Sequence, residues 1–346
     1  MVRKTTKHYI AYLDILGYKD FLKNKPEQAE QYLQTILDAV EKIKHFASNF
    51  QYFKDEFQID ADLKLKVFSD NILLCLSVNQ GDDEIRRAIV FLLSVASIQR
   101  GLVLGHGLLV RGGITISELY IDEDLVFGQG LVEAVELESK AEYPCIVASD
   151  ALQKFLSALL HDVTEQYQKL KEIVQKEKRN EHLSNEENAF LSEKKELVAR
   201  EVYRTNTLRE LLKHFDNETA FLNYLFDLSF AHLFGYEFAD YVNREAAKDP
   251  KRYKDIVGTV EDYYAILWAH REMVIKEVKE YCNYNDVEKT DPAAVLQREK
   301  IIRKYMWLLR YHVSMCQERK FQQGLFPFRF GCDETVLRQI VEVGKL

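Results

Sequence analysis

Two aspartates stand in places where an acidic side chain is costly to keep. Asp14 lies near the end of residues 8–16, an apolar run rich in aromatic and branched side chains that indicates a buried strand. Asp70 lies in the turn-forming triplet Ser69-Asp70-Asn71, between two strand-like runs. An ionised carboxylate on a buried strand is strongly destabilising unless a cation or strong hydrogen-bond donors compensate it. We therefore expect Asp14 to have such a partner.

Neighbouring strands would make Asp14 and Asp70 joint ligands of Mg²⁺ or Mn²⁺, which prefer oxygen atoms. Two such ions activate an attacking hydroxyl and neutralise a leaving pyrophosphate. The alternative is that Asp14 caps the following helix and Asp70 only makes the turn. For either acid alone that alternative is favoured, whereas the two acids together favour a metal site.

The first half of the chain must supply the elements that position these acids. Its apolar spacing predicts the order strand, helix, two-strand hairpin, helix, strand, helix, strand. The ranges are 8–16, 26–46, 63–68 with 72–78, 82–104, 108–120, 129–141 and 145–148. If the strands join one antiparallel sheet, two helices pack on one of its faces. That arrangement is the split-βαβ, ferredoxin-like palm of an α+β protein.

The second half of the chain is predicted to be helical, which suggests a first domain at 1–150 and a helical domain at 151–346. Residues 163–202 are dense in Lys, Glu, Gln and Asn, a composition typical of a solvated helical hairpin. Residues 304–312 carry aromatic side chains at helical spacing. Core packing is favoured over a base-binding surface for this stripe, and His312 is expected to pack rather than to bind a ligand.

Composition limits the partners and the compartment. A net charge of −8 and a pI near 5.7 argue against a broad surface for duplex nucleic acid, but permit a local basic pocket for a triphosphate. The five cysteines are scattered without a CxxC pair, so we expect a reduced, cytoplasmic protein. The N-terminus lacks the apolar run of a signal peptide, and polar side chains interrupt residues 88–110, so we expect no membrane segment.

Four motifs in order resemble the catalytic domain of class III adenylate and guanylate cyclases over residues 8–150. The first is similar to that family's first metal motif and the second to its second, which often has a base-selecting lysine four residues before the aspartate. They are Asp14-Ile15-Leu16-Gly17-Tyr18, Lys66-Val67-Phe68-Ser69-Asp70, Arg111-Gly112-Gly113-Ile114 and Phe127-Gly128-Gln129-Gly130.

The resemblance implies a two-metal cyclase that acts on a nucleoside triphosphate. Two Mg²⁺ or Mn²⁺ ions would be held by Asp14, Ile15 and Asp70, and the products would be a 3′,5′-cyclic nucleotide and pyrophosphate. The substrate would contact the segment from Ile15 through Leu16 and Gly17 to Tyr18, with Lys66 at the base. Because sites in this family lie between two subunits, the resemblance also implies a homodimer.

The chain departs from the family where that family carries an asparagine and, four residues later, an arginine. Val132 and Glu136 stand there instead. Either the cation that stabilises the reacting phosphate comes from elsewhere, with Lys140 and Arg111 as candidates, or the domain does not cyclise. The family's base-contacting aspartate is replaced by Leu125. That replacement puts purine selection in doubt and suits a pyrimidine.

The wording of the motifs also resembles the bacterial cyclases of Pycsar antiphage systems, which make cyclic UMP or cyclic CMP. That closer resemblance implies an antiviral signal and a downstream effector that responds to a cyclic nucleotide. Two other functions stay open. One is a catalytically inactive, cyclase-like nucleotide sensor or scaffold, favoured by Val132 and Glu136; the other is a palm that makes a linear or cyclic oligonucleotide.

Three smaller features each allow two interpretations. The amides near Gly17 either open a helix that holds phosphate or belong to an ordinary tight turn. The pair Gly112-Gly113 either lets the backbone approach a nucleotide or marks a strand bulge, and the bulge is favoured. Glu133 and Glu136 are expected to be acids on a helix surface.

Overall fold

The structure is a computed structural model that describes residues 4–17, 27, 29–48, 63–78, 84–215, 219–226, 260–282 and 292–317. The chain divides into two compact units. The first contains residues 1–141 and 145–260, and the second contains residues 142–144 and 261–346.

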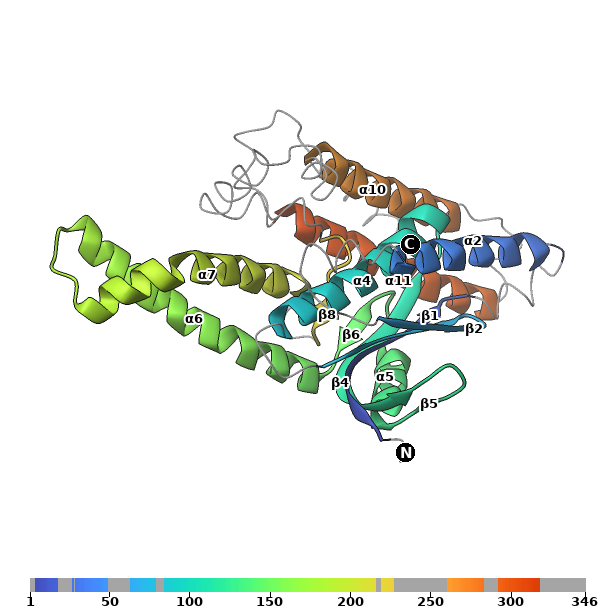
Figure 1. The fold of residues 1–346 in the computed structure, drawn as a ribbon. Coiled ribbons are helices and arrows are strands. Elements are labelled where there is room, and N and C mark those ends of the chain that lie inside the picture. Colours follow the sequence, from blue (N-terminus) through green and yellow to red (C-terminus); the bar gives the residue numbers. More distant parts are fainter. Residues whose placement is uncertain are drawn as a thin grey trace. The chain divides into compact units, whose positions relative to one another are not determined.

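Four strands of the first unit form the palm, in the order β2-β3-β1-β4 (Figure 1). They are β1 (Thr6–Ile15), β2 (Lys64–Phe68), β3 (Asn71–Ser77) and β4 (Val110–Ile121). Each strand is antiparallel to its neighbour. β2 therefore runs parallel to β1 with β3 between them, and β4 runs parallel to β3 with β1 between them. The two pairs of parallel strands, β1 with β2 and β3 with β4, each form a split βαβ motif. The predicted ferredoxin-like palm of an α+β protein is therefore confirmed.

Three further strands extend the same sheet beyond β4. β6 (Ile146–Ala148) pairs parallel to β4, and β8 (Phe221–Leu222) and β7 (Leu212–Lys213) follow. The pairing of Val147 with Phe221 joins residues on either side of position 150 in one sheet. The structure therefore does not divide at residue 150 as the sequence suggested, because backbone hydrogen bonds of residues 212–222 complete the first unit.

One face of the palm packs against helices. α4 (Glu84–His106) follows β3, and α2 (Ala29–Ser48) contacts both α4 and β2. Tyr9 of β1 stacks on Phe91 of α4 with ring centroids 5.5 Å apart, and its hydroxyl donates to Glu84 Oε1 at 2.6 Å. These contacts bury the side chains that alternate with Asp14 along β1, so they hold the strand that carries the candidate ligand.

By length and composition, α4 is the helix in the described part of the chain that could cross a membrane. Within its apolar window, 72% of the residues are buried inside the protein. A core helix passes the same test, so this is weak evidence for a membrane segment. The polar side chains noted in the sequence do not prevent α4 from being strongly apolar.

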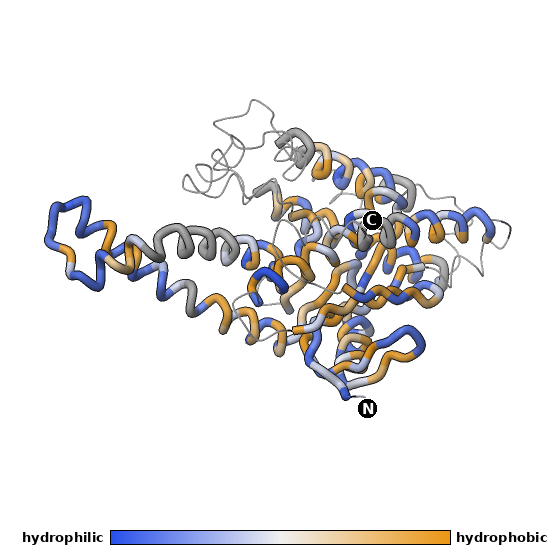
Figure 2. The backbone as a smooth tube through the Cα atoms, in the orientation of Figure 1, coloured by the Kyte–Doolittle hydropathy of each residue, from blue (hydrophilic) through white to orange (hydrophobic). Residues whose placement is uncertain are grey.

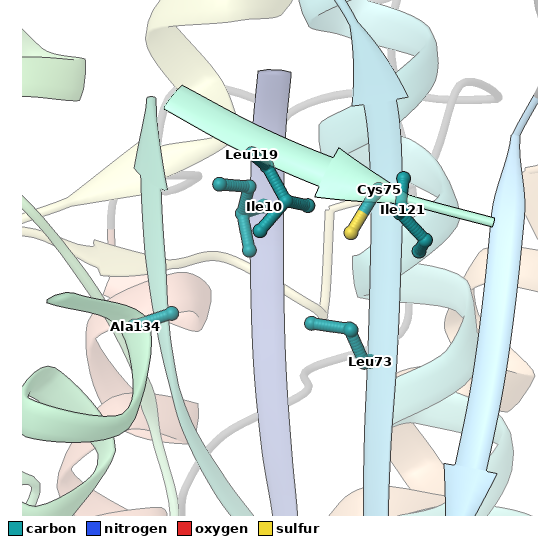
Figure 3. Packing of buried hydrophobic residues seen from close by; sticks show 6 residues of the cluster. All are labelled: Ile10, Leu73, Cys75, Leu119, Ile121 and Ala134. Atoms are coloured by element: carbon teal, nitrogen blue, oxygen red, sulfur yellow. The ribbon is translucent and has the colours of Figure 1, made fainter. Parts of the chain in front are cut away.

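The opposite face of the palm carries α5 (Gln129–Lys140) and β5 (Val126–Phe127), which pairs with the end of β4. Figure 3 shows the buried cluster on this face. Its members come from β1, β3, β4 and α5: Ile10, Leu73, Cys75, Leu119, Ile121 and Ala134. Tyr12 packs at the margin of the cluster. Asp14 is two residues further along β1 and therefore lies on this same face.

Two long helices leave the palm as a hairpin, α6 (Asp150–Lys178) and α7 (Asn185–Glu210), which lie side by side (Figure 1). Its tip is hydrophilic (Figure 2). There Ser184 and Glu187 form a capping box, and Lys176 bridges to Glu187 at 2.7 Å. The predicted solvated helical hairpin is confirmed for the described side chains.

The second unit contains α10 (Val260–Cys282) and α11 (Pro292–Gln317). The aromatic residues of α11 are buried, and Trp307 stacks on Tyr311 at 5.7 Å. His312 lies with its Nδ1 3.3 Å from Nδ1 of His270, and both rings are buried. Core packing, the favoured interpretation of residues 304–312, is therefore confirmed.

Candidate active site

The ends of β1 and of the β2–β3 hairpin bring Asp14 and Asp70 to the same edge of the palm. Asp14 is paired in register with Asn71, the residue after Asp70. The amide of Ile15 donates to the backbone carbonyl of Asp70 at 3.0 Å, and Nδ2 of Asn71 donates to Asp70 Oδ1 at 3.1 Å. The turn needs Ser69 in a left-handed conformation with φ of 57°. A tight two-residue turn therefore holds Asp70, a largely buried acid, beside the strand that carries Asp14.

Asp14 has the kind of partner that a buried carboxylate needs. This partner is Arg111, which lies directly opposite Asp14 on β4. Arg111 Nε is 3.1 Å from Asp14 Oδ2 and 2.6 Å from Glu138 Oε1 on α5. Lys140, the other cation considered from the sequence, is exposed at the end of α5. Of the two candidates, the structure puts Arg111 beside the acids.

Glu138 is a member of this group that sequence reasoning missed. Its side chain is 8% exposed, and its Oε1 has no hydrogen-bond partner among the described residues. Arg111 Nε carries one hydrogen, which is donated to Asp14, so its contact with Glu138 is an ion pair without an aligned hydrogen bond. Burial raises the pKa of Glu138, and the nearby Arg111 opposes that rise.

The charges around Tyr12 are unbalanced toward the negative. Burial raises the pKa of the Tyr12 hydroxyl, and the carboxylates of Glu138, Asp14 and Asp70 raise it further. Three carboxylates therefore act on one phenol, and the guanidinium of Arg111 offsets one of them. A group with more acids than bases favours the binding of a cation.

The donor set fits a hard divalent cation bound together with a substrate. Asp14 and Asp70 supply the oxygen atoms that Mg²⁺ and Mn²⁺ prefer, and the backbone carbonyl of Ile15 adjoins them in sequence. In the described part of the chain, no three His, Cys, Asp or Glu side chains are grouped closely enough to hold a metal ion. The remaining ligands would be phosphate oxygens and water, which is how proteins usually hold Mg²⁺ at a triphosphate.

Two of the amides after Asp14 donate to backbone carbonyls. Ile15 N donates to Asp70 O, and Leu16 N donates to Leu109 O at 2.8 Å. These two amides are therefore committed to backbone carbonyls, and the prediction that amides near Gly17 hold phosphate stays a prediction. Gly17 is exposed, with φ of 88° and open space around it. Tyr18, and any helix that begins at it, lies outside the described residues.

Lys66, expected to contact the base, lies on the same sheet face as Tyr12. Its Nζ donates to the backbone carbonyl of Glu123, and Lys64 Nζ donates to that of Ile121 at 3.1 Å. Both lysines of the edge strand thus hold the turn between β4 and β5. The Lys66 ammonium has three N–H donors, so this hydrogen bond does not prevent a contact with a base.

Of the glycine pair on β4, Gly113 serves helix packing, whereas Gly112 faces the neighbouring strand β1. The register of β4 with β1 is unbroken through Gly112 and Gly113, so the expected strand bulge is absent from these residues. A Cβ on Gly113 would lie 2.3 Å from the carbonyl oxygen of Ala134. Glycine at this position lets α5 approach β4 closely enough for Glu138 to reach Arg111.

The acids of α5 have different surroundings. Glu133 is partly buried and accepts hydrogen bonds from Thr115 at 3.1 Å and Ser117 at 3.3 Å, so it also ties α5 to β4. Glu136 is exposed, as predicted. Val132 is also exposed, so the position at which the cyclase family carries an asparagine faces away from the buried cluster.

No protein-family model matches this chain, and comparison with curated proteins finds no match. Among solved structures, the adenylyl cyclase CyaB from P. aeruginosa is similar at 12% identity and a TM-score of 0.34, over 43% of this chain and 80% of that one. A class III adenylyl cyclase-like ATP-binding protein from Pseudomonas aeruginosa is 15% identical, with a TM-score of 0.33, over 43% of this chain and 34% of that one. An adenylate/guanylate cyclase/hydrolase from Silicibacter pomeroyi is 18% identical, with a TM-score of 0.26, over 44% and 80%. These likenesses are too weak to bear on function, whereas the strand order establishes the palm by itself.

Proposed function

We propose that the first unit binds a nucleoside triphosphate with Mg²⁺ or Mn²⁺ and converts it to a 3′,5′-cyclic nucleotide and pyrophosphate. The observation that carries this proposal is the meeting of Asp14 and Asp70 at one edge of a split-βαβ palm, in a group with more acids than bases. The order of the four cyclase-like motifs along the same elements supports it.

Asp14, Asp70 and the carbonyl of Ile15 would hold two metal ions. When bound, such ions lower the pKa of the attacking hydroxyl and neutralise the leaving pyrophosphate. Arg111, 3.1 Å from Asp14, is the cation best placed to contact the reacting phosphate. Lys140 is the second candidate for that role. Gly17 and Tyr18 remain proposed contacts of the triphosphate.

A pyrimidine triphosphate is the substrate we propose, with UTP and CTP as the two options. Leu125, at the position of the base-contacting aspartate of purine cyclases, has no polar group and is 51% exposed in the β4–β5 turn. Lys66 is held at the same turn. The resemblance of the motifs to Pycsar cyclases supports the same choice, together with an antiviral signal and an effector that binds the product.

A homodimer is supported by apolar side chains that the first unit leaves exposed. Phe127 is 66% exposed on β5, and Val132 is 51% exposed on the first turn of α5. Large apolar side chains grouped on a surface are typical of protein interfaces. Cys75 is a buried free thiol, which fits the reducing conditions of the cytoplasm, the compartment we propose.

The proposal is tested by incubating the protein with Mn²⁺ or Mg²⁺ and each of ATP, GTP, CTP and UTP, with products identified by mass spectrometry. One cyclic mononucleotide from one triphosphate, absent with Asp70→Asn, is the expected result. A linear or cyclic oligonucleotide would instead favour a polymerase-like palm. An assay repeated in phage lysate covers an enzyme that needs an activating signal.

A second candidate function is a nucleotide sensor that does not turn its ligand over. It is favoured by Glu136, an acid where the cyclase family has its arginine, and by the pairing of Arg111 with two acids. Tight binding of a triphosphate with no product under either condition would support the sensor and contradict the cyclase.

A further inference from the structure

Arg111 is shared by two acids that come from different elements. Its Nε lies 3.1 Å from Asp14 Oδ2 on β1 and 2.6 Å from Glu138 Oε1 on α5. The single hydrogen on Nε is donated to Asp14. Glu138 Oε1 is therefore a buried acceptor at contact distance from the guanidinium, with no hydrogen bond from the described residues. A buried acceptor of this kind destabilises the state in which it lacks a donor, so a second state in which a donor reaches it is favoured by the removal of that cost.

A metal ion on Asp14 and the guanidinium of Arg111 would compete for the same carboxylate. In the structure, Asp14 Oδ2 accepts from Arg111. A divalent cation on that oxygen repels a guanidinium that stays beside it. Arg111 therefore needs another anion when the metal binds, and Glu138 already lies 2.6 Å away. A rotation that turns the Nε hydrogen from Asp14 to Glu138 would also satisfy Glu138 Oε1.

We propose that Glu138 is a positioning residue that takes Arg111 over from Asp14 when metal and triphosphate bind. This inference rests on the proposed function. Glu138 would hold Nε, and the terminal nitrogens of the guanidinium would stay available to the reacting phosphate, since the planar fork has five donors. Glu138 thereby compensates for Glu136, which stands where the cyclase family has an arginine.

The geometry of α5 assigns this role to Glu138 and not to the other acids of the helix. Gly130, Ala134 and Glu138 are spaced by four residues and form the buried side of α5. Glu133 is engaged by Thr115 and Ser117 of β4. Glu136 is exposed and makes a matched control, because its removal changes the charge of the helix by the same amount.

The test compares Mn²⁺ affinity, from the electron paramagnetic resonance signal of the free ion, in wild type, Glu138→Gln, Arg111→Gln, the double variant and Glu136→Gln. Glu138→Gln should weaken Mn²⁺ binding about five- to tenfold, roughly 1–1.4 kcal/mol, because Arg111 then stays on Asp14. Arg111→Gln should strengthen it. In the Arg111→Gln background, adding Glu138→Gln should change it by less than about twofold. Glu136→Gln should match wild type in Mn²⁺ affinity.

An equal loss of affinity from Glu138→Gln with and without Arg111 would overturn the proposal, because Glu138 would then act on the metal directly. Asp14→Asn separates this failure from that of the proposed function. If it leaves Mn²⁺ binding unchanged, the metal site itself is wrong. If it abolishes binding while Glu138→Gln has no effect, the proposed function stands and the role of Glu138 falls. Circular dichroism of each variant checks that it is folded.

Discussion

Each unit contains a buried polar group, and the two groups differ in charge balance. In the palm, Asp14 and Glu138 share one guanidinium, and a carboxylate oxygen is left without a hydrogen bond from the described residues. In the second unit, His270 and His312 lie with Nδ1 atoms 3.3 Å apart among stacked aromatic rings. A hydrogen bond between the two rings needs one nitrogen to donate and the other to accept, so that pair needs no ligand. The candidate site in the palm thus carries excess negative charge, whereas the histidine pair in the core of the second unit is not a charged site.

The largest expected effect comes from removing an acid of the charged group. Asp70→Asn should lower kcat for cyclic nucleotide formation by about a hundredfold or more, the scale found when a group that stabilises transition-state charge is lost. Stability should be maintained or raised, because one of several mutually repelling charges is removed. Asp38→Asn, on the exposed side of α2, is the control and should leave both properties unchanged. A kcat equal to wild type in Asp70→Asn would remove Asp70 from the site.

The packing of α5 that brings Glu138 to Arg111 can be broken at Gly113. Gly113→Ala places a Cβ 2.3 Å from Ala134 O, so it should destabilise the first unit by about 1–3 kcal/mol and lower activity. Gly101→Ala, in α4 with open space around it, should instead stabilise by up to about 1 kcal/mol. Denaturant unfolding followed by circular dichroism measures both. Equal effects from the two variants would show that the close approach of α5 does not matter.

The stability of the second unit should depend on pH through the buried pair His270 and His312. Burial lowers the pKa of His270 well below 6.5, and the nearby His312 lowers it further. The unfolded chain therefore binds a proton that the folded chain refuses, so stability is complete above pH 6.5 and falls as the pH drops below it. The slope should approach about 1.4 kcal/mol per pH unit for one proton.

Tryptophan fluorescence isolates this response, because both tryptophans, Trp268 and Trp307, belong to the second unit. Urea unfolding by fluorescence at pH 7.5 and 5.5 should show the loss in wild type and a reduced loss in His270→Gln, which does not titrate. A pH dependence that is identical in His270→Gln would contradict the role given to this pair.

The smallest expected effect lies at the tip of the α6–α7 hairpin, where charge is exposed and compensated. Ser184→Ala removes the cap of α7 and should cost about 1 kcal/mol locally, with no change in activity. Hydrogen exchange should speed up in residues 176–190. Ser192→Ala, about two turns into α7 and exposed, should leave exchange unchanged, and an equal effect there would count against the capping box.

The palm could be predicted because its strands alternate or run apolar over five to twelve residues, and because the order of elements permits few sheet topologies. Asp14 and Asp70 were visible for the same reason, since each interrupts or ends such a run. The two-residue strands β7 and β8 carry no periodicity, so the sequence could not show that residues 212–222 join the sheet.

Glu138 was hidden by the sequence for a different reason. Helix α5 has two other acids, Glu133 and Glu136, and composition alone does not tell which of the three faces the sheet. The available signal was spacing: Gly130, Ala134 and Glu138 share one side of the helix, so an acid stands on a side otherwise made of small residues. Its contact with Arg111 depends on the close approach of α5 to β4 that Gly113 permits. The sequence alone does not show this approach.

Asp14 and Asp70 are proposed to hold metal for a bound triphosphate. A crystal structure of the protein with Mn²⁺ and a non-cyclisable triphosphate would test this proposal directly. Anomalous scattering should place manganese about 2.0–2.2 Å from oxygen atoms of both aspartates and of the triphosphate. Arg111 should lie away from Asp14 and on Glu138. A structure with triphosphate bound elsewhere, and Arg111 still on a metal-free Asp14, would contradict the account.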